Sequence, residues 1–265
     1  MDTLVDYAGP GDAGGPFARL TLNSPHNRNA LSTQLVSQLH QGLRDAASDP
    51  AVRAVVLGHT GGTFCAGADL SEAGGGDPFD MAAARARELI ALLRAIVELP
   101  LPVIAAINGH VRAGGFGLVG ACDIAVAGPR STFALTEARI GVAPAIISLT
   151  LLPKMSARAA ARYYLTGETF DARQAADIGL ITMAAEDVDA SVAKVVADVG
   201  RGSPQGLAAS KALTTAAVLE GFDRNAERLA DESARLFVSD EAREGMLAFL
   251  QKRPPSWAPV DDAGQ

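Results

Sequence analysis

Two kinds of hydrophobic spacing follow one another along the first part of the chain. Apolar and polar residues alternate over 18–22, which predicts a half-buried strand. After Ser32, a residue type that caps helix N-termini, apolar residues recur at helical spacing toward Ala47. Three short apolar runs predict further strands over 52–57, 103–107 and 124–126, and a long helix is expected over 81–98. Strands that alternate with helices favour βα units, a largely parallel sheet and right-handed crossovers.

The pattern changes after Ile181, where the helical spacing continues without further apolar strand runs. Pro254 and Pro255 end the last helical stretch, because proline cannot continue a helix. We therefore expect two parts, an α/β core over residues 1–200 and a helical C-terminal region over residues 201–265. The helices expected after Ile181 cover 188–199, 205–219, 223–238 and 241–250.

Composition and charge narrow the classes of partner. The chain has 265 residues and a net charge of −7, so an extended basic surface for nucleic acid or anionic membrane is not expected. Cys65, Cys122 and the four histidines lack zinc-ligand spacing, so no metal site is expected. The N-terminus shows no secretory signal, and the apolar stretch around 101–107 is too short to span a bilayer. These features favour a soluble cytoplasmic protein.

Two glycine-rich segments could carry chemistry. The segment 115–120 matches G-x-G-x-x-G, but six residues separate the preceding strand from Gly114, and only two separate Gly120 from Asp123. This spacing leaves no room for the crossover helix of a dinucleotide-binding unit. The alternative is a turn whose glycines free backbone N–H groups at a helix N-terminus, which suits an anion or a developing oxyanion. The second segment, Phe64–Leu70, has small residues that would allow a ligand to approach the backbone closely.

Taken with several other segments, this pair resembles the crotonase family, the enoyl-CoA hydratases and isomerases. The resemblance extends from about Leu4 to Arg253, and the order of the segments is more specific than any one of them. It implies an α/β crotonase (ClpP-like) fold with repeated ββα units, a mostly parallel sheet and a helical C-terminal trimerisation region. The segments that carry the resemblance are 27–31, 64–70, 105–109, 113–115, 121–127, 133–141 and 175–181.

The resemblance also implies a substrate class and an assembly. Family members act on acyl-CoA thioesters, so coenzyme A is expected as part of the substrate. No metal, nicotinamide or flavin cofactor is expected. The family usually forms trimers, often paired into hexamers, so a homotrimer or hexamer is the expected assembly.

The resemblance assigns catalytic roles to three residues. By motif position, the backbone N–H groups of Ala68 and Gly114 form the oxyanion hole that holds the thioester carbonyl and stabilises its enolate. Glu137 matches one of the two glutamates of typical hydratases, while Gly117 occupies the position of the other. Coenzyme A or the substrate would contact Arg28, Ala30, Ala66, Asp69, Leu70, Gly115, Phe249 and Lys252.

The absence of a second glutamate leaves more than one function open. We favour an enoyl-CoA hydratase, which adds water across the double bond of a 2-enoyl-CoA in fatty-acid or branched acyl-CoA degradation. The alternatives are a Δ3-Δ2 enoyl-CoA isomerase with Glu137 as its one carboxylate, and a non-catalytic acyl-CoA binder. Arg112 lies in a loop position that is commonly apolar in the family. It would make a subunit contact or surface salt bridge, or pair with a carboxylate on the acyl group.

Overall fold

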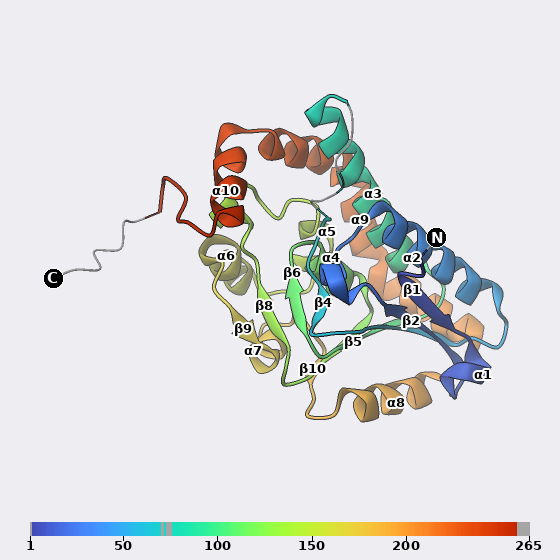
Figure 1. Cartoon of the computed structure of the whole chain (residues 1–265). Helices are drawn as coiled ribbons and strands as arrows, with labels where there is room; N and C mark the ends of the chain where they lie inside the picture. Colours follow the sequence, from blue (N-terminus) through green and yellow to red (C-terminus); the bar gives the residue numbers. More distant parts are fainter. Residues whose placement is uncertain (1, 70–71, 73–75, 259–265) are drawn as a thin grey trace.

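The architecture is built on a six-stranded, mostly parallel sheet (Figure 1). The computed structural model describes residues 2–69, 72 and 76–258. Only β1 at the sheet edge is antiparallel to its neighbour, which is β2. The spatial order is β1 (Val5–Ala8), β2 (Phe17–Leu22), β3 (Ala54–His59), β5 (Val103–Ile107), β7 (Ile124–Ala127) and β10 (Met183–Ala184).

A second, four-stranded sheet is formed by short strands between the elements of the first. Strands β4, β6 and β8 pair in parallel, and β9 closes the sheet antiparallel to β8. Its strands are β4 (Thr63–Cys65), β6 (His110–Arg112), β8 (Thr132–Ala134) and β9 (Phe170–Asp171). Short helices connect the strands of the two sheets: α1 (Pro10–Ala13), η1 (Pro25–Asn27), α4 (Gly114–Ala121), η2 (Glu137–Ile140), α5 (Ser148–Leu151), α6 (Ala157–Thr166) and α7 (Ala172–Asp177).

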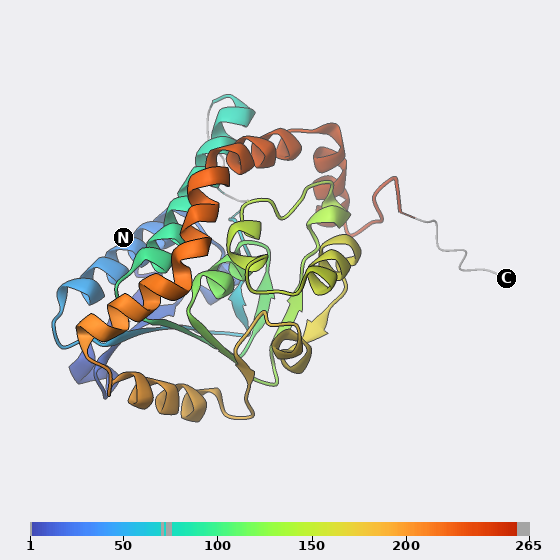
Figure 2. The same ribbon diagram turned by 180° about the vertical axis from the view of Figure 1, so that it is seen from behind.

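The two faces of the larger sheet pack against different helices. Alternate residues of β3 separate, with Val55 in the larger core cluster and Val56 in the smaller one. Helix α8 (Val188–Val199) covers the smaller cluster and lies apart from the other long helices (Figure 2). The opposite face holds the main core, to which α2 (Thr33–Ser48), α3 (Pro78–Glu98) and α9 (Pro204–Phe237) contribute.

The C-terminal region differs from the sequence-based prediction at one point. The two helices expected over 205–219 and 223–238 form one continuous helix, α9. Gly221 lies inside it in open space, while Val218 and Phe222 on either side are buried in the main core. A helical glycine costs about 1 kcal/mol relative to alanine, which is less than burial of the two neighbouring side chains contributes. The apolar stripe is therefore continuous across Gly221, and the prediction of a break there was wrong.

Helix α9 and the following helix α10 (Asp240–Leu250) return along the body of the molecule (Figure 2). Leu229 and Ala230 of α9 belong to the same core cluster as the sheet, so this helix shares the core of the α/β part. The division at residue 200 and the role of this region in trimerisation stay predictions. Within the described residues, no helix is both long and apolar enough to cross a membrane.

Candidate active site

The segment that contains Ala68 runs beside the turn after η1. Leu31 and Ala68 form a parallel bridge, in which the Leu31 N–H donates to Gly67 O over 2.7 Å. The Asp69 N–H in turn donates to Leu31 O. Successive N–H groups in an extended strand point to opposite sides. The N–H of Ala68 therefore points away from Leu31 and is not used by this bridge.

The N-terminus of α4 lies directly against this segment. Gly67 has φ +94°, and a Cβ on it would lie 2.5 Å from Ala113 Cβ and 3.1 Å from Gly114 N. Only glycine tolerates both the dihedral angle and the close approach. Ala113 itself has φ 44° and ψ −123°, a strained conformation for a residue with a side chain, of the kind found at functional sites. Ala68 is therefore next to Gly114, whose N–H is one of the donors at a helix start that lack an intrahelical partner.

A cavity of about 860 Å³ opens beside these two residues. Its size falls in the range of small-molecule sites. Ala68, Leu31 and Leu89 line it, and both leucines also lie next to Gly114. The described residues that line the cavity are Leu31, Val36, Ala68, Asp69, Glu72, Gly76, Pro78, Met81, Ala82, Arg85, Ala86, Glu88, Leu89, Ile146, Ser233, Phe237, Val238, Ser239, Arg243, Met246, Leu247 and Leu250.

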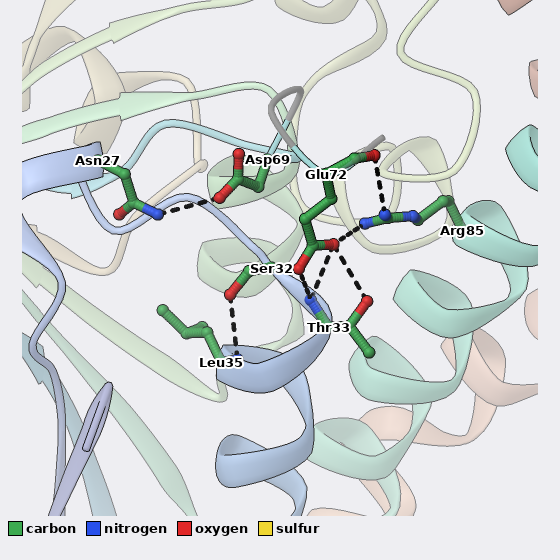
Figure 3. A network of polar contacts seen from close by, with 7 residues as sticks. All are labelled: Asn27, Ser32, Thr33, Leu35, Asp69, Glu72 and Arg85. Atoms are coloured by element: carbon green, nitrogen blue, oxygen red, sulfur yellow. Dashed lines mark hydrogen bonds and ion pairs between the residues drawn. The ribbon is translucent and has the colours of Figure 1, made fainter. Parts of the chain in front are cut away.

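One wall of the cavity has a polar network that joins α2 to α3 (Figure 3). The Glu72 carboxylate accepts from the backbone N–H of Thr33 over 3.0 Å and forms an ion pair with Arg85. Asn27 donates to Asp69 over 3.1 Å. A carboxylate at the N-terminus of α2 is also favoured by the helix dipole. The network ties the Glu72 side chain to both helices at the cavity wall.

Glu137 opens the short helix η2 and is buried. Burial raises the pKa of its carboxyl to about 7, while a hydrogen bond from its own backbone opposes the rise. Its Oε2 has no hydrogen-bond partner among the described residues. A carboxyl with a pKa near neutrality can both accept and return a proton, which is what acid–base catalysis requires.

Helix α10 packs closely on the chain that contains Glu137. A Cβ on Gly245 would lie 2.5 Å from the Ile140 carbonyl, and one on Gly141 would lie 2.6 Å from the Glu241 carbonyl. The two glycines therefore allow backbone-to-backbone contact between α10 and η2. Met246, Leu247 and Leu250 of the same helix line the cavity. Helix α10 thus contacts both the candidate glutamate segment and the cavity within one chain.

Gly117 lies in α4 and is closed in by apolar side chains. A Cβ there would lie 2.8 Å from Ile147 Cγ2 and 3.0 Å from Leu93 Cδ1. Ile147 and Leu93 are themselves buried. Gly115 is packed in a similar way, because a Cβ on it would lie 2.7 Å from Cys65 O. These glycines bring α4 close to its neighbours, and no space for a second carboxylate is left at Gly117.

Ala68 and Asp69 are the two residues predicted from sequence that line the cavity. The other described residues predicted for the site, including Gly114 and Glu137, are not among those that line the cavity, and their catalytic or binding roles stay predictions. Leu70 lies outside the described residues. Arg28 is exposed in a left-handed conformation, Ala30 and Gly115 are buried, Ala66 is half-buried, and Phe249 and Lys252 are exposed on the C-terminal side of α10.

Arg112 is held by backbone groups of the smaller sheet. Its Nη1 donates to Val111 O over 2.7 Å and to Thr132 O over 2.8 Å, and Nη2 donates to Thr132 Oγ1. Burial lowers the pKa of its guanidinium. The side chain is therefore fastened to β8, and its proposed pairing with a substrate carboxylate would require these bonds to change.

Sequence analysis named none of the cavity-lining residues of α3 and α10 as site residues, and it did not single out Tyr164. The cavity-lining residues of the two helices carry no motif, although their apolar helical spacing is visible in the sequence. Tyr164 of α6 has a buried hydroxyl that finds no hydrogen-bond partner in the described part of the chain. No sequence signal marks it, because its neighbour Tyr163 is a tyrosine as well and lies in the core.

Comparisons with known proteins identify the family of this chain. The enoyl-CoA hydratase/isomerase family model matches residues 13–259. The crystal structure of an enoyl-CoA hydratase from Mycobacterium avium is 82% identical, with a TM-score of 0.93 over 97% of this chain and 100% of that chain. Enoyl-CoA hydratase EchA19 of Mycobacterium tuberculosis is 32% identical over 252 residues, covering 90% of this chain and 91% of its own.

A more specialised relative is mevalonyl-coenzyme A hydratase sidH of Aspergillus fumigatus. It is 31% identical over 250 residues, covering 91% of this chain and 90% of its own. The expected fold, an α/β crotonase fold with a mostly parallel sheet and a helical C-terminal region, is confirmed. The chain belongs to the enoyl-CoA hydratase/isomerase family, the crotonase superfamily, whose members act on acyl-CoA thioesters.

Proposed function

We propose that this protein is an enoyl-CoA hydratase that adds water to a 2-enoyl-CoA with Glu137 as its one catalytic carboxylate. The observation that carries the proposal is the buried Glu137 carboxyl, with its pKa raised to about 7 and Oε2 unpartnered among the described residues. The family supplies the substrate class. Burying a carboxylate without a hydrogen-bond partner costs free energy. Such groups are found at functional sites, where a substrate or a water molecule binds to them.

In this proposal the thioester carbonyl oxygen binds the N–H groups of Ala68 and Gly114. As water attacks C3, the electrons of the double bond move toward this oxygen, and an enolate forms. Preorganised backbone donors stabilise such an oxyanion more strongly than the ground-state carbonyl. The strained Ala113 and the contact of Gly67 with Gly114 fix the two donors before substrate binds.

Glu137 then acts in both proton transfers. It takes one proton from the attacking water as the C3–O bond forms, and it gives that proton to C2 as the enolate collapses. The product has gained one water molecule, and the carboxylate is regenerated. The two proton transfers therefore need no second carboxylate. At Gly117, Ile147 and Leu93 leave no space for one.

Ultraviolet absorbance of the conjugated enoyl thioester tests the proposal. With 2-enoyl-CoA substrates of short, long and carboxylated chains, we expect loss of absorbance for at least one substrate. Glu137→Gln should reduce kcat by roughly 10²–10⁴-fold, since it keeps the shape of the side chain but cannot accept the proton. The matched control is Glu186→Gln, because Glu186 is exposed and its ion pair with Arg173 lies on the surface. Equal rates for Glu137→Gln and wild type would refute the assignment.

A Δ3-Δ2 enoyl-CoA isomerase is the second candidate, and the closed surroundings of Gly117 favour it. One carboxylate can move a proton from C2 to C4 of a 3-enoyl-CoA without adding water. A rise in absorbance with 3-enoyl-CoA, and no loss with any 2-enoyl-CoA, would select this activity. If neither class of substrate changes the absorbance, a non-catalytic acyl-CoA binder becomes the better explanation.

A further inference from the structure

Two buried polar atoms without partners lie on elements that pack together. They are Oε2 of Glu137 on η2 and the hydroxyl oxygen of Tyr164 on α6, and neither has a hydrogen-bond partner among the described residues. Helix α6 packs against η2. After burial, the Glu137 carboxylate is the second cause that raises the pKa of the Tyr164 hydroxyl.

An unpartnered buried oxygen costs free energy, so two of them on elements that pack together need an explanation. A raised pKa keeps the tyrosine protonated at neutral pH, so its hydroxyl is available as a hydrogen-bond donor. Glu137 Oε2, when ionised, can only accept. A water molecule can accept from the first group and donate to the second, which satisfies both.

We propose that Tyr164 is a positioning residue of the active site, and that its hydroxyl and Glu137 Oε2 together bind the water that adds to the substrate. This inference deepens the proposed hydratase function and rests on it for the identity of the reaction. The Tyr164 hydroxyl donates to the water oxygen, whose remaining lone pair attacks C3. The water proton goes to Glu137, and no proton leaves Tyr164. Tyr164 thereby supplies the second contact to water that Gly117 cannot provide.

Among the described residues of η2, α6 and α10, the other charged side chains are paired elsewhere or exposed, whereas the Tyr164 hydroxyl is buried without a hydrogen-bond partner. Arg139 of η2 donates to Thr166 O, and Arg162 of α6 forms an ion pair with Glu168. Arg158 of α6 and Glu241 of α10 are exposed. On α10 the remaining pairs are Arg243 with Asp240 and Arg253 with Glu244.

The test compares Tyr164→Phe with Tyr163→Phe, which removes the same atom from the neighbouring side chain. Tyr163 packs its ring 4.0 Å from that of Phe170 and has no assigned role in the site. The first readout is the protonation of Glu137 in substrate-free protein, followed by infrared difference spectroscopy of the carboxyl C=O band. Loss of the band in Glu137→Gln identifies it.

A water held by both groups stabilises the ionised carboxylate, so its loss should raise the titration midpoint of Glu137. We expect a midpoint above that of wild type in Tyr164→Phe and no change in Tyr163→Phe. In hydration assays, Tyr164→Phe should lower kcat by roughly tenfold or more with little change in KM, while Tyr163→Phe should not.

The two readouts separate failure of this inference from failure of the proposed function. An unchanged midpoint in Tyr164→Phe, or equal shifts in both phenylalanine variants, would overturn the shared water site. An unchanged kcat in an active enzyme would overturn the positioning role. If the wild type hydrates no enoyl-CoA but the Tyr164→Phe midpoint rises selectively, the shared site stands and the hydratase proposal fails.

Discussion

The resemblance predicts that Gly117 and Glu137 correspond to the two glutamate positions of typical family hydratases, and the surroundings of these two residues differ sharply. A side chain at Gly117 would meet Ile147 and Leu93, so this position is apolar and filled. At Glu137 a carboxyl and a tyrosine hydroxyl are buried without partners among the described residues. Two carboxylates in one dry site raise each other's pKa, so ionising the second costs more free energy than ionising the first. Under the proposed function, the acid–base chemistry therefore lies on the Glu137 side alone.

The largest effect is expected from removal of an oxyanion donor, on which the proposed chemistry at Glu137 depends. Gly114→Pro deletes one N–H, and proline is tolerated at the first position of a helix. We expect kcat/KM for enoyl-CoA to fall roughly 10²–10³-fold.

Gly114→Ala is the matched control, because it keeps the N–H. It adds one methyl group 2.9 Å from Leu31 Cδ1, the end of a flexible side chain. Activity of the correctly folded proline variant equal to that of the alanine variant would contradict the role of Gly114.

The next effect concerns the free energy of unfolding and its dependence on pH. The folded pKa of Glu137 is raised from the ordinary 4.5 to about 7. The folded protein therefore binds this proton more tightly, and its stability falls as pH rises from about 4.5 to about 7. Glu137→Gln removes this dependence, so we expect it to be more stable than wild type by about 3 kcal/mol above neutral pH.

Denaturant unfolding at several pH values checks this prediction. Below the ordinary carboxyl pKa the difference between Glu137→Gln and wild type should disappear, because the buried group is then protonated in both the folded and the unfolded state. A constant difference across the whole pH range would show that packing, and not ionisation, separates the two proteins.

A substitution with a smaller expected effect tests whether neighbouring side chains fill the space around Gly117. We expect Gly117→Ala to lower the free energy of unfolding by about 1 kcal/mol, because overpacking outweighs the better helix propensity of alanine. Gly221→Ala in α9 is the control, since its Cβ would lie in open space and should stabilise the protein by up to about 1 kcal/mol. Stabilisation by both changes would mean that Ile147 and Leu93 move aside freely.

Arg112→Leu should have the smallest effect. Its donors bind backbone carbonyls of Val111 and Thr132, so we expect a loss of about 1 kcal/mol in stability. The kcat/KM ratio between neutral and carboxylated acyl-CoA substrates should stay the same. A selective loss with carboxylated substrates would instead place Arg112 at the acyl group and extend the polar side of the site beyond Glu137 and Tyr164.

The candidate oxyanion segments could be predicted from local sequence, and their catalytic role stays a prediction. Gly67, Ala68 and Gly114 belong to short ordered motifs, since their backbone geometry needs small residues at fixed places. The continuity of α9 could not be predicted in this way, because Gly221 favours a break locally. Burial of Val218 and Phe222 against the sheet overrides that preference. Local sequence gave the wrong prediction where contacts with distant segments determined the structure.

The sequence by itself determined the family and the parallel α/β pattern and predicted the oxyanion donors and the single glutamate, because these depend on short motifs and on their order along the chain. Tertiary structure decided the environment of those groups. It placed Gly117 against Ile147 and Leu93, packed α6 with Tyr164 against the helix of the buried Glu137, and brought α10 onto η2 and the cavity. These outcomes depend on packing between segments far apart in sequence, and burial, pKa and the shape of a cavity arise only from such packing.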